Sequence, residues 1–207
     1  MAGCSHDMQF DGASKAYKRA LVAVIAINGA MAVAELWAGL AAQSVALQAD
    51  ALDFIGDTAT YGLSLLVVGA PLLVRARVAL LKGVSLAVMA VVVLGASLNF
   101  ALSGSAPQAP VMTGIGVVAL LANLASVVIL MRWRDGDANV RSVWLCSRND
   151  AIGNVAVMAA GGLVWATGSN APDLIVAALM AGLFLRSAIE IITRALGERA
   201  HALSPHH

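Results

Sequence analysis

Charged side chains are scarce in this sequence. Only 12% of its 207 residues are Asp, Glu, Lys or Arg, and 60% are hydrophobic, whereas soluble domains carry about 25% charged residues. So few charges cannot cover a surface that faces water, which excludes an ordinary soluble enzyme and a disordered chain. The net charge of +1 offers no basic surface for phosphate contacts, so a nucleic acid partner is excluded as well.

Cysteine is also rare. The only two, Cys4 and Cys146, are far apart in the sequence and make no disulfide framework. Glycine, by contrast, occurs 19 times, and small residues allow helices to pack closely in lipid. Composition therefore predicts a membrane protein whose partner is the lipid bilayer.

Six apolar stretches are long enough to cross a membrane. A bilayer core of ~30 Å needs about 20 apolar residues in a helix, and these stretches lack the two-residue alternation of a membrane β-barrel. We therefore predict an all-α polytopic membrane protein with a six-helix domain over residues 20–197, a cytoplasmic tail over 1–19 and a short cytoplasmic tail over 198–207. The spans are expected at 20–41, 45–72, 79–102, 110–131, 142–167 and 172–194.

The basic residues set the expected orientation. Eleven of the 13 lie before the first span, at the end of the sixth span or after it, or in and beside the second and fourth connections (Arg75–Val78 with Lys82, and Arg132–Val140 with Arg141). Lys and Arg are enriched in cytoplasmic loops, so both termini are expected to be cytoplasmic, with a bacterial inner membrane as the expected location. An alternative interpretation takes the first span as a signal peptide, which would leave five spans and spoil this charge pattern.

Several acids lie inside the predicted spans, where a charge costs ~2.5–3.5 kcal/mol on insertion scales. Asp50, Asp53 and Asp57 follow one another at positions i, i+3 and i+7, a spacing that places all three on one helical face. That face is expected to look into the bundle or into a water-filled cavity. Glu35, in the first span, is expected to pair with a buried basic residue such as Arg148 or Arg186.

The fifth span carries a second possible ligand pair. Cys146 and Asp150 stand at positions i and i+4 and share a helical face. Two helices that each present such a pair can close four ligands around one ion, and carboxylate oxygens with a thiolate suit tetrahedral Zn²⁺ or a softer ion. Because neighbouring carboxylates repel, a cation or protons must sit among them, as a transporter that exchanges a divalent metal ion for protons requires.

Two segments resemble the signatures of the cation diffusion facilitator family: residues 44–57 (SVALQADALDFIGD) and 142–155 (SVWLCSRNDAIGNV). The resemblance implies a homodimeric exporter of Zn²⁺ or a related divalent cation in exchange for H⁺, not an enzyme and without a resident cofactor. It carries the metal ligands over to Asp53, Asp57, Cys146 and Asp150.

The sequence departs from this family in two ways. Only about ten residues follow Gly197, too few for the cytoplasmic domain that members usually carry, which points to a truncated branch. Cys146 stands where the family usually has histidine. Since a thiolate is softer than an imidazole, Cd²⁺ becomes a candidate beside Zn²⁺.

The fourth ligand has a second candidate. Residues 53–57 and 150–154 share the pattern Asp-x-Ile-Gly-(Asp/Asn), and aligned in this way Asn154 matches Asp57. Cys146, near the cytoplasmic end of its span, would then lie to one side of the site. Asp50 is either a further ligand or an acid of the vestibule that leads to it.

Two other functions remain open at this point. A metal-sensing or partner-binding membrane module would bind a cation without moving it. An intramembrane aspartyl hydrolase could use Asp57 and Asp150, because two acids that share a proton can cleave a peptide bond.

Overall fold

The computed structural model describes residues 14–66, 72–103, 106–133 and 138–203, with backbone alone for some of them, including 138–146. Within these ranges the chain forms six long α-helices, one 3₁₀ turn (η2, Met131–Trp133) and no strand. The helices are α1 (Lys15–Ala42), α2 (Val45–Leu66), α3 (Leu72–Ser103), α4 (Ala109–Leu130), α5 (Ala138–Thr167) and α6 (Ala171–Leu203). The predicted all-α architecture with six helices is confirmed.

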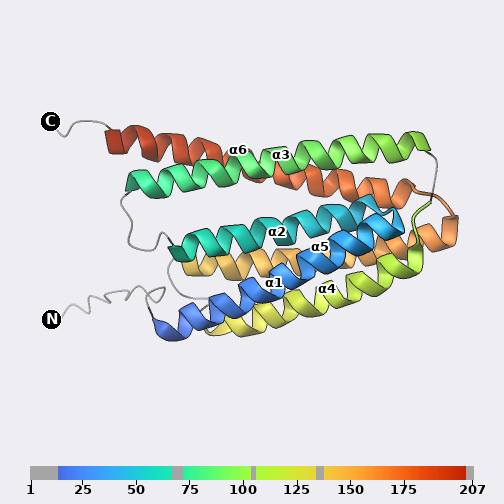
Figure 1. The fold of residues 1–207 in the computed structure, drawn as a ribbon, viewed down its shortest axis with the longest axis horizontal. Helices are drawn as coiled ribbons and strands as arrows, with labels where there is room; N and C mark the ends of the chain where they lie inside the picture. The colour runs from blue at the N-terminus through green and yellow to red at the C-terminus, as the bar shows by residue number, and fades with distance from the viewer. Residues whose placement is uncertain (1–13, 67–71, 104–105, 134–137, 204–207) are drawn as a thin grey trace, which may run out of the picture.

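The helices run up and down in three layers (Figure 1). Helices α1 and α4 form one outer layer, α2 and α5 the middle, and α3 and α6 the other outer layer. Helices α1, α2, α4 and α5 pack on one another and are called here the four-helix group. Helices α3 and α6 pack mainly on each other and meet the four-helix group through α2 and α5, so the bundle consists of a group and a pair.

The helices extend beyond the predicted spans. Helix α1 begins at Lys15 and α6 continues to Leu203. The prediction that Arg75–Val78 connects the second and third spans is wrong, because α3 already begins at Leu72. Apolar length marks where the chain is in lipid, but backbone hydrogen bonds continue a helix past that boundary.

Five of the six helices are long and apolar enough to cross a membrane: α1, α3, α4, α5 and α6. Each of these five contains an apolar stretch of 18 residues with at most two charged side chains. Helix α2 has 22 residues, but every 18-residue stretch of it contains Asp50, Asp53 and Asp57. It lies in the middle layer, where the other helices cover it. The protein is therefore a multi-pass membrane protein, and the helix that carries three acids lies in the middle layer of the bundle.

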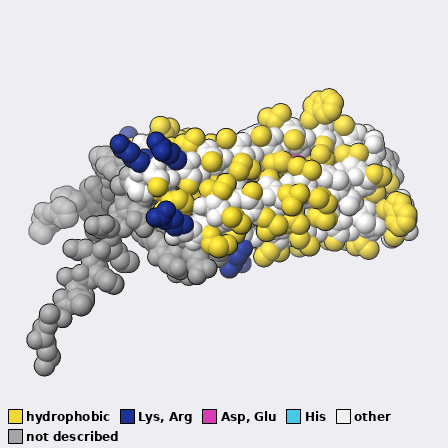
Figure 2. All heavy atoms as spheres, turned by 90° about the horizontal axis from the view of Figure 1, so that it is seen from below, with side chains coloured by type: hydrophobic (Ala, Val, Ile, Leu, Met, Phe, Trp, Pro, Cys, Tyr) yellow, Lys and Arg dark blue, Asp and Glu magenta, His cyan; other side chains and the backbone are white. Residues whose placement is uncertain are grey.

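Basic side chains mark one end of the bundle. Figure 2 shows Lys and Arg gathered at the end where α1 begins and α6 ends, while the rest of that face is largely hydrophobic. Lys15 and Lys18 begin α1, and Arg194 lies near the end of α6. By the positive-inside rule we name this the cytoplasmic end and its opposite the outer end. Trp37 and Trp165, 79% and 81% exposed, lie near the outer end, as an interfacial aromatic belt requires.

The turn between α1 and α2 is very short. Only Gln43 and Ser44 separate the two helices, and Gln43 adopts a left-handed conformation with φ 54°. The Ser44 amide donates to the Gly39 carbonyl oxygen at 3.0 Å, which closes the end of α1. A Cβ atom on Gly39 would lie 3.0 Å from the Gln48 backbone nitrogen, so the corner needs glycine there.

The largest apolar cluster fills the outer half of the bundle. It contains the first residues of α2 and α4, the last turns of α5, the first half of α6 and part of α3. We call this cluster the outer seal; its buried members are Val45, Ala46, Leu47, Ala49, Ala90, Val93, Ala109, Met112, Val157, Ala160, Val164, Ala177, Met180, Ala181 and Phe184. A smaller cluster around Tyr17, Tyr61 and Leu130 joins α1, α2 and α4 near the cytoplasmic end.

Close helix contacts depend on glycine. In lipid the hydrophobic effect does not drive helices together, so close packing between small residues must stabilise their association. Where α4 crosses α5, a Cβ atom on Gly161 would lie 2.7 Å from Thr113 Oγ1 and 3.2 Å from the Thr113 backbone nitrogen. The neighbouring Gly162 has no heavy atom within 4 Å of the same position.

This contrast predicts opposite outcomes for two adjacent substitutions. Gly161→Leu is expected to destabilise the protein by about 1–3 kcal/mol, the usual cost of overpacking, because α4 and α5 must separate. Gly162→Leu is expected to leave stability unchanged, since its side chain enters lipid. Thermal unfolding in detergent measures both, and equal melting temperatures for the two variants would contradict the packing described.

Candidate functional site

A cavity of about 320 Å³ lies between the four-helix group and the α3–α6 pair. Helices α2, α3, α5 and α6 all contribute to its wall. The lining residues are Asp53, Gly56, Asp57, Thr60, Leu86, Asp150, Gly153, Met180, Leu183, Phe184, Ser187 and Ile191. Its wall is thus apolar on α3 and largely apolar on α6, and acidic on α2 and α5.

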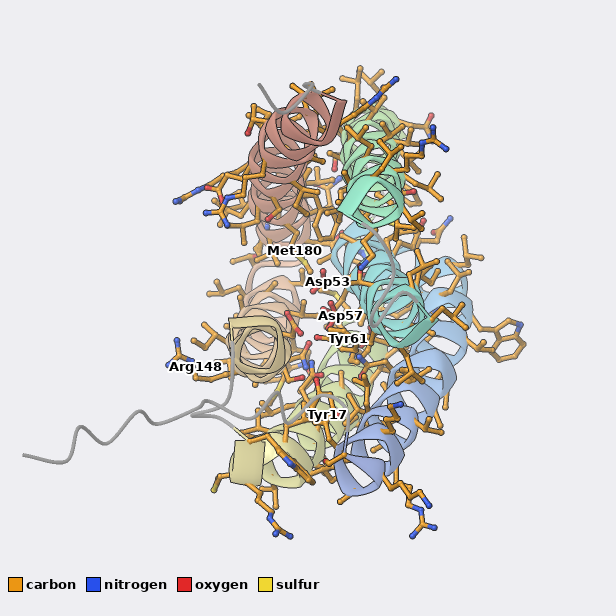
Figure 3. The ribbon with its side chains drawn as sticks, turned by 90° about the vertical axis from the view of Figure 1, so that its left-hand side faces the viewer. Tyr17, Asp53, Asp57, Tyr61, Arg148 and Met180 are labelled. Carbon is orange, nitrogen blue, oxygen red and sulfur yellow. The ribbon has the colours of Figure 1, made fainter. Side chains whose placement is uncertain are left out.

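Three of the predicted ligands line this one cavity. Asp53 and Asp57 project from α2 toward α5, as Figure 3 shows from the cytoplasmic end. The Asp150 carboxyl group on α5 lines the same cavity and is a neighbour of both. At 1.5 Å rise per residue, Asp53 and Asp57 lie about 12 and 18 Å from the outer end of α2, near the middle of a ~30 Å bilayer core.

The three carboxyl groups are neighbours without forming a ready-made metal centre. Among the residues that the structure describes, no three His, Cys, Asp or Glu side chains are placed so that they could hold a metal ion together. Cys146 belongs to α5, but its side chain lies outside the described residues. The predicted four-ligand set therefore stays a prediction, with the three acids gathered around one cavity.

Neither of the less favoured ligands lines the cavity. Asn154 is fully buried on α5, and its amide nitrogen and oxygen have no hydrogen-bond partner. Asp50 is buried on α2, one turn before Asp53, and its Oδ2 atom is also unpartnered. Both residues lie within the bundle interior beside the cavity wall, and whether either one reaches a cation stays a prediction.

The expected partner of Glu35 is absent. Neither carboxyl oxygen of this buried side chain has a hydrogen-bond partner, and its nearest charged neighbour is the Asp50 carboxyl group. Arg186 instead pairs with Glu190, one turn away, through a 3.2 Å contact on the exposed face of α6. The prediction of a Glu35–Arg186 pair is therefore wrong. Figure 3 shows Arg148 on the side of α5 that points away from Asp53 and Asp57.

Tyr61 is a site residue that sequence analysis did not identify. Its hydroxyl group donates a hydrogen bond to Asp57 Oδ2 from one turn along α2, while its ring is buried in the cluster with Tyr17 and Leu130. The i, i+4 spacing of Asp57 and Tyr61 was a signal for this contact. The hydroxyl group fixes one oxygen of Asp57 and leaves the other for the cavity.

A basic residue also reaches the wall of the cavity. Lys82, on α3, donates through Nζ to the Thr60 carbonyl oxygen at 2.9 Å, and Thr60 lines the cavity. This bond ties the α3–α6 pair to α2 on the cytoplasmic side of Asp57. Lys82 was considered at the sequence level only as part of the basic cluster that sets orientation.

The cavity is closed toward the outer end and extends toward the cytoplasmic end. Met180 and Phe184 belong both to its wall and to the outer seal, so packed apolar side chains separate Asp53 from the outer end. Its other lining residues include Thr60, Ser187 and Ile191, which lie further toward the cytoplasmic end. Asp53, Asp57 and Asp150, which line this cavity, are partly exposed.

Comparison with known families agrees with this geometry. Residues 76–198, more than half of the chain, match the model of the cation efflux transmembrane domain. The matched part includes Asp150 and Cys146 and begins after Asp53 and Asp57. No curated protein sequence matches the chain.

Members of this family transport cations across membranes. An acidic cavity inside a six-helix bundle of a membrane protein is consistent with that role. The chain thus belongs to the cation efflux family, the cation diffusion facilitators whose motifs it resembles.

Proposed function

We propose that this protein exports Zn²⁺ or Cd²⁺ from the cytoplasm in exchange for protons. The observation that carries the proposal is that Asp53, Asp57 and Asp150, from two helices, share one cavity that is sealed at the outer end. Carboxylate oxygens bind divalent cations directly, and the desolvated interior makes the attraction much stronger than in water. The cation would draw the three carboxyl groups together from their present separation.

Proton exchange follows from the same charges. Three adjacent carboxylates without a cation repel one another in a low-dielectric interior, and protonation relieves the repulsion. A metal ion that leaves toward the outer side would therefore be replaced by protons, and a metal ion that enters from the cytoplasm would displace them. The two ions compete for one set of oxygens, which couples their movements.

Transport also requires that the cavity face the two sides in turn. We propose that the α3–α6 pair rocks against the four-helix group around the fixed acids, in the manner of transporters built from two bundles. The cavity lies between these two units, so their relative motion would open one end as it closes the other.

The resemblance also implies a homodimer, and we retain this as part of the proposal, in a bacterial inner membrane. The Arg186–Glu190 pair supports it, because the two side chains are 77% and 59% exposed within a membrane-crossing helix. A second copy that covers this face would remove two charges from lipid, where they are costly.

The direct test is metal flux. Asp57→Ala, reconstituted in proteoliposomes, is expected to lose at least about 90% of Zn²⁺ transport, because removing a ligand leaves the other buried acids unable to hold the cation. Ser85→Ala changes an exposed residue of α3 that does not line the cavity and is expected to transport at the parental rate. Undiminished flux in Asp57→Ala would refute the proposal, and Zn²⁺ binding without flux in the parent protein would favour the sensor instead.

Tyr61→Phe tests how Asp57 is positioned. The ring stays packed, but Asp57 loses the hydrogen bond that fixes its Oδ2 atom, and loss of such a supporting contact typically costs 10–100-fold in metal affinity or activity. We expect Zn²⁺ flux, measured over a range of Zn²⁺ concentrations, to show a loss of affinity or rate of this size. Tyr17→Phe makes the same change in the same cluster, away from the cavity, and is expected to show no fall. Equal effects of the two substitutions would mean that Tyr61 acts through packing alone.

Cys146→His tests the proposed fourth ligand. Because imidazole is harder than thiolate, the variant is expected to shift preference from Cd²⁺ toward Zn²⁺ when the two metals compete in the flux assay. Asn154→Ala, in parallel, removes the other candidate. A metal preference that changes with Asn154→Ala and not with Cys146→His would assign the fourth ligand to Asn154.

A further inference from the structure

A buried carboxylate joins α6 to the start of α2 at the outer end of the bundle. Asp173 lies in the first turn of α6 and is 1% exposed. Its Oδ1 atom accepts hydrogen bonds from Ser44 Oγ at 2.5 Å and from the Ala46 amide at 3.2 Å, and its Oδ2 atom accepts one from the Val45 amide at 2.8 Å. Three donors from the turn before α2 and its first two residues therefore converge on one acid of α6.

These contacts complete the capping of α2. The first amide groups of any helix have no partner within the helix and must find one elsewhere. Asp173 takes those of Val45 and Ala46, and the Ser44 hydroxyl oxygen takes that of Leu47 at 3.1 Å. A negative charge at this position also interacts favourably with the positive end of the helix dipole. The site is specific for a carboxylate because only an acceptor with two ionised oxygens serves all three donors.

The position of Asp173 matters because it bridges the two units. Helix α2 belongs to the four-helix group and carries Asp53 and Asp57, whereas α6 belongs to the α3–α6 pair and carries the cavity-lining Met180 and Phe184. The other hydrogen bonds described at this end do not join α2 to the α3–α6 pair. Gln108 bonds to Ala41 and Ala42 within the four-helix group, and Asn170 bonds from the α5–α6 turn to the Phe100 carbonyl oxygen at the end of α3.

We infer that Asp173 is a positioning residue that holds the outer end of the transport cavity closed, by fixing the start of α2 against α6 over the outer seal. This inference rests on the proposed function, because only a cavity that opens alternately needs a closure at this end. The apolar contacts of the outer seal are not directional and do not fix one relative position of α2 and α6. Three hydrogen bonds to one carboxylate do fix such a position. Opening toward the outside must break or lengthen them.

The test measures outer-side access to a sealed position rather than metal movement. Ala177 is fully buried one turn after Asp173 and belongs to the outer seal. In a chain with Cys4→Ser and Cys146→Ser, Ala177→Cys is labelled with a membrane-impermeant maleimide added to the outside of right-side-out vesicles. Asp173→Asn is expected to raise the labelling rate about tenfold, since loss of a hydrogen bond to a charged group shifts an equilibrium by roughly that factor or more.

Two further variants distinguish closure from general loosening. Ser44→Ala removes one of the three donors and is expected to raise labelling by a smaller factor. Asn170→Ala removes the hydrogen bond to Phe100 at the same end and is expected to leave labelling unchanged. Unchanged labelling in Asp173→Asn, or an equal rise in Asn170→Ala, would overturn the inference. If Asp173→Asn yields no folded protein by gel filtration, Ser44→Ala decides alone, and an unchanged rate in that variant overturns it.

The outcome separates this inference from the proposed function. The labelling assay contains no metal, so a rise in labelling together with absent Zn²⁺ flux in the parent protein would refute zinc export and leave the closure standing. Normal Zn²⁺ flux with unchanged labelling would refute the closure alone.

Discussion

Mutual repulsion among buried carboxylates is the constraint on which this structure depends. Asp53, Asp57 and Asp150 line one cavity inside the bundle, where charges interact far more strongly than in water. Their charge can be balanced there only by a cation or by protons. Two surrounding features agree with this need: α2 lies in the middle layer, and Tyr61 holds one oxygen of Asp57.

The division of the bundle into a group and a pair would give these charges a movable wall, as the proposed transport requires. Within the four-helix group, glycine at the α4–α5 crossing brings backbones into close contact, and the two-residue turn keeps α1 with α2. Between the group and the pair, the contacts are fewer, and they include the outer seal and two hydrogen-bonded links. Asp173 joins them at the outer end and Lys82 joins them toward the cytoplasmic end. A membrane protein that must open in turn at two ends is expected to place its reversible bonds at such a boundary.

Much of this arrangement could be predicted from the sequence. Hydropathy located six helices, and the i, i+3, i+7 spacing placed Asp53 and Asp57 on one face, because helical periodicity is a local property. The ends of α1, α3 and α6 could not be placed in this way. Hydropathy indicates which residues lie in lipid, whereas a helix ends where its backbone hydrogen bonds end. Asp173 was missed for a different reason. An acid in the first turn of a helix is common, and only the tertiary fold shows that it caps another helix. Glu35 has no basic partner because Arg186 lies on the outer face of α6, a direction that spacing alone did not reveal.

The composition of α2 also bears on how the protein is made. On a translocon scale, an aspartate at the centre of a span costs about 2.5–3.5 kcal/mol, so a helix with three of them gains little by partitioning into lipid alone. The tight corner at Gln43 and Ser44 joins this helix to α1, which is apolar enough to insert by itself. Helix α2 therefore enters the bilayer as the second arm of a hairpin. Asp53 and Asp57 point toward α5, so they are enclosed only when the later helices pack against this hairpin.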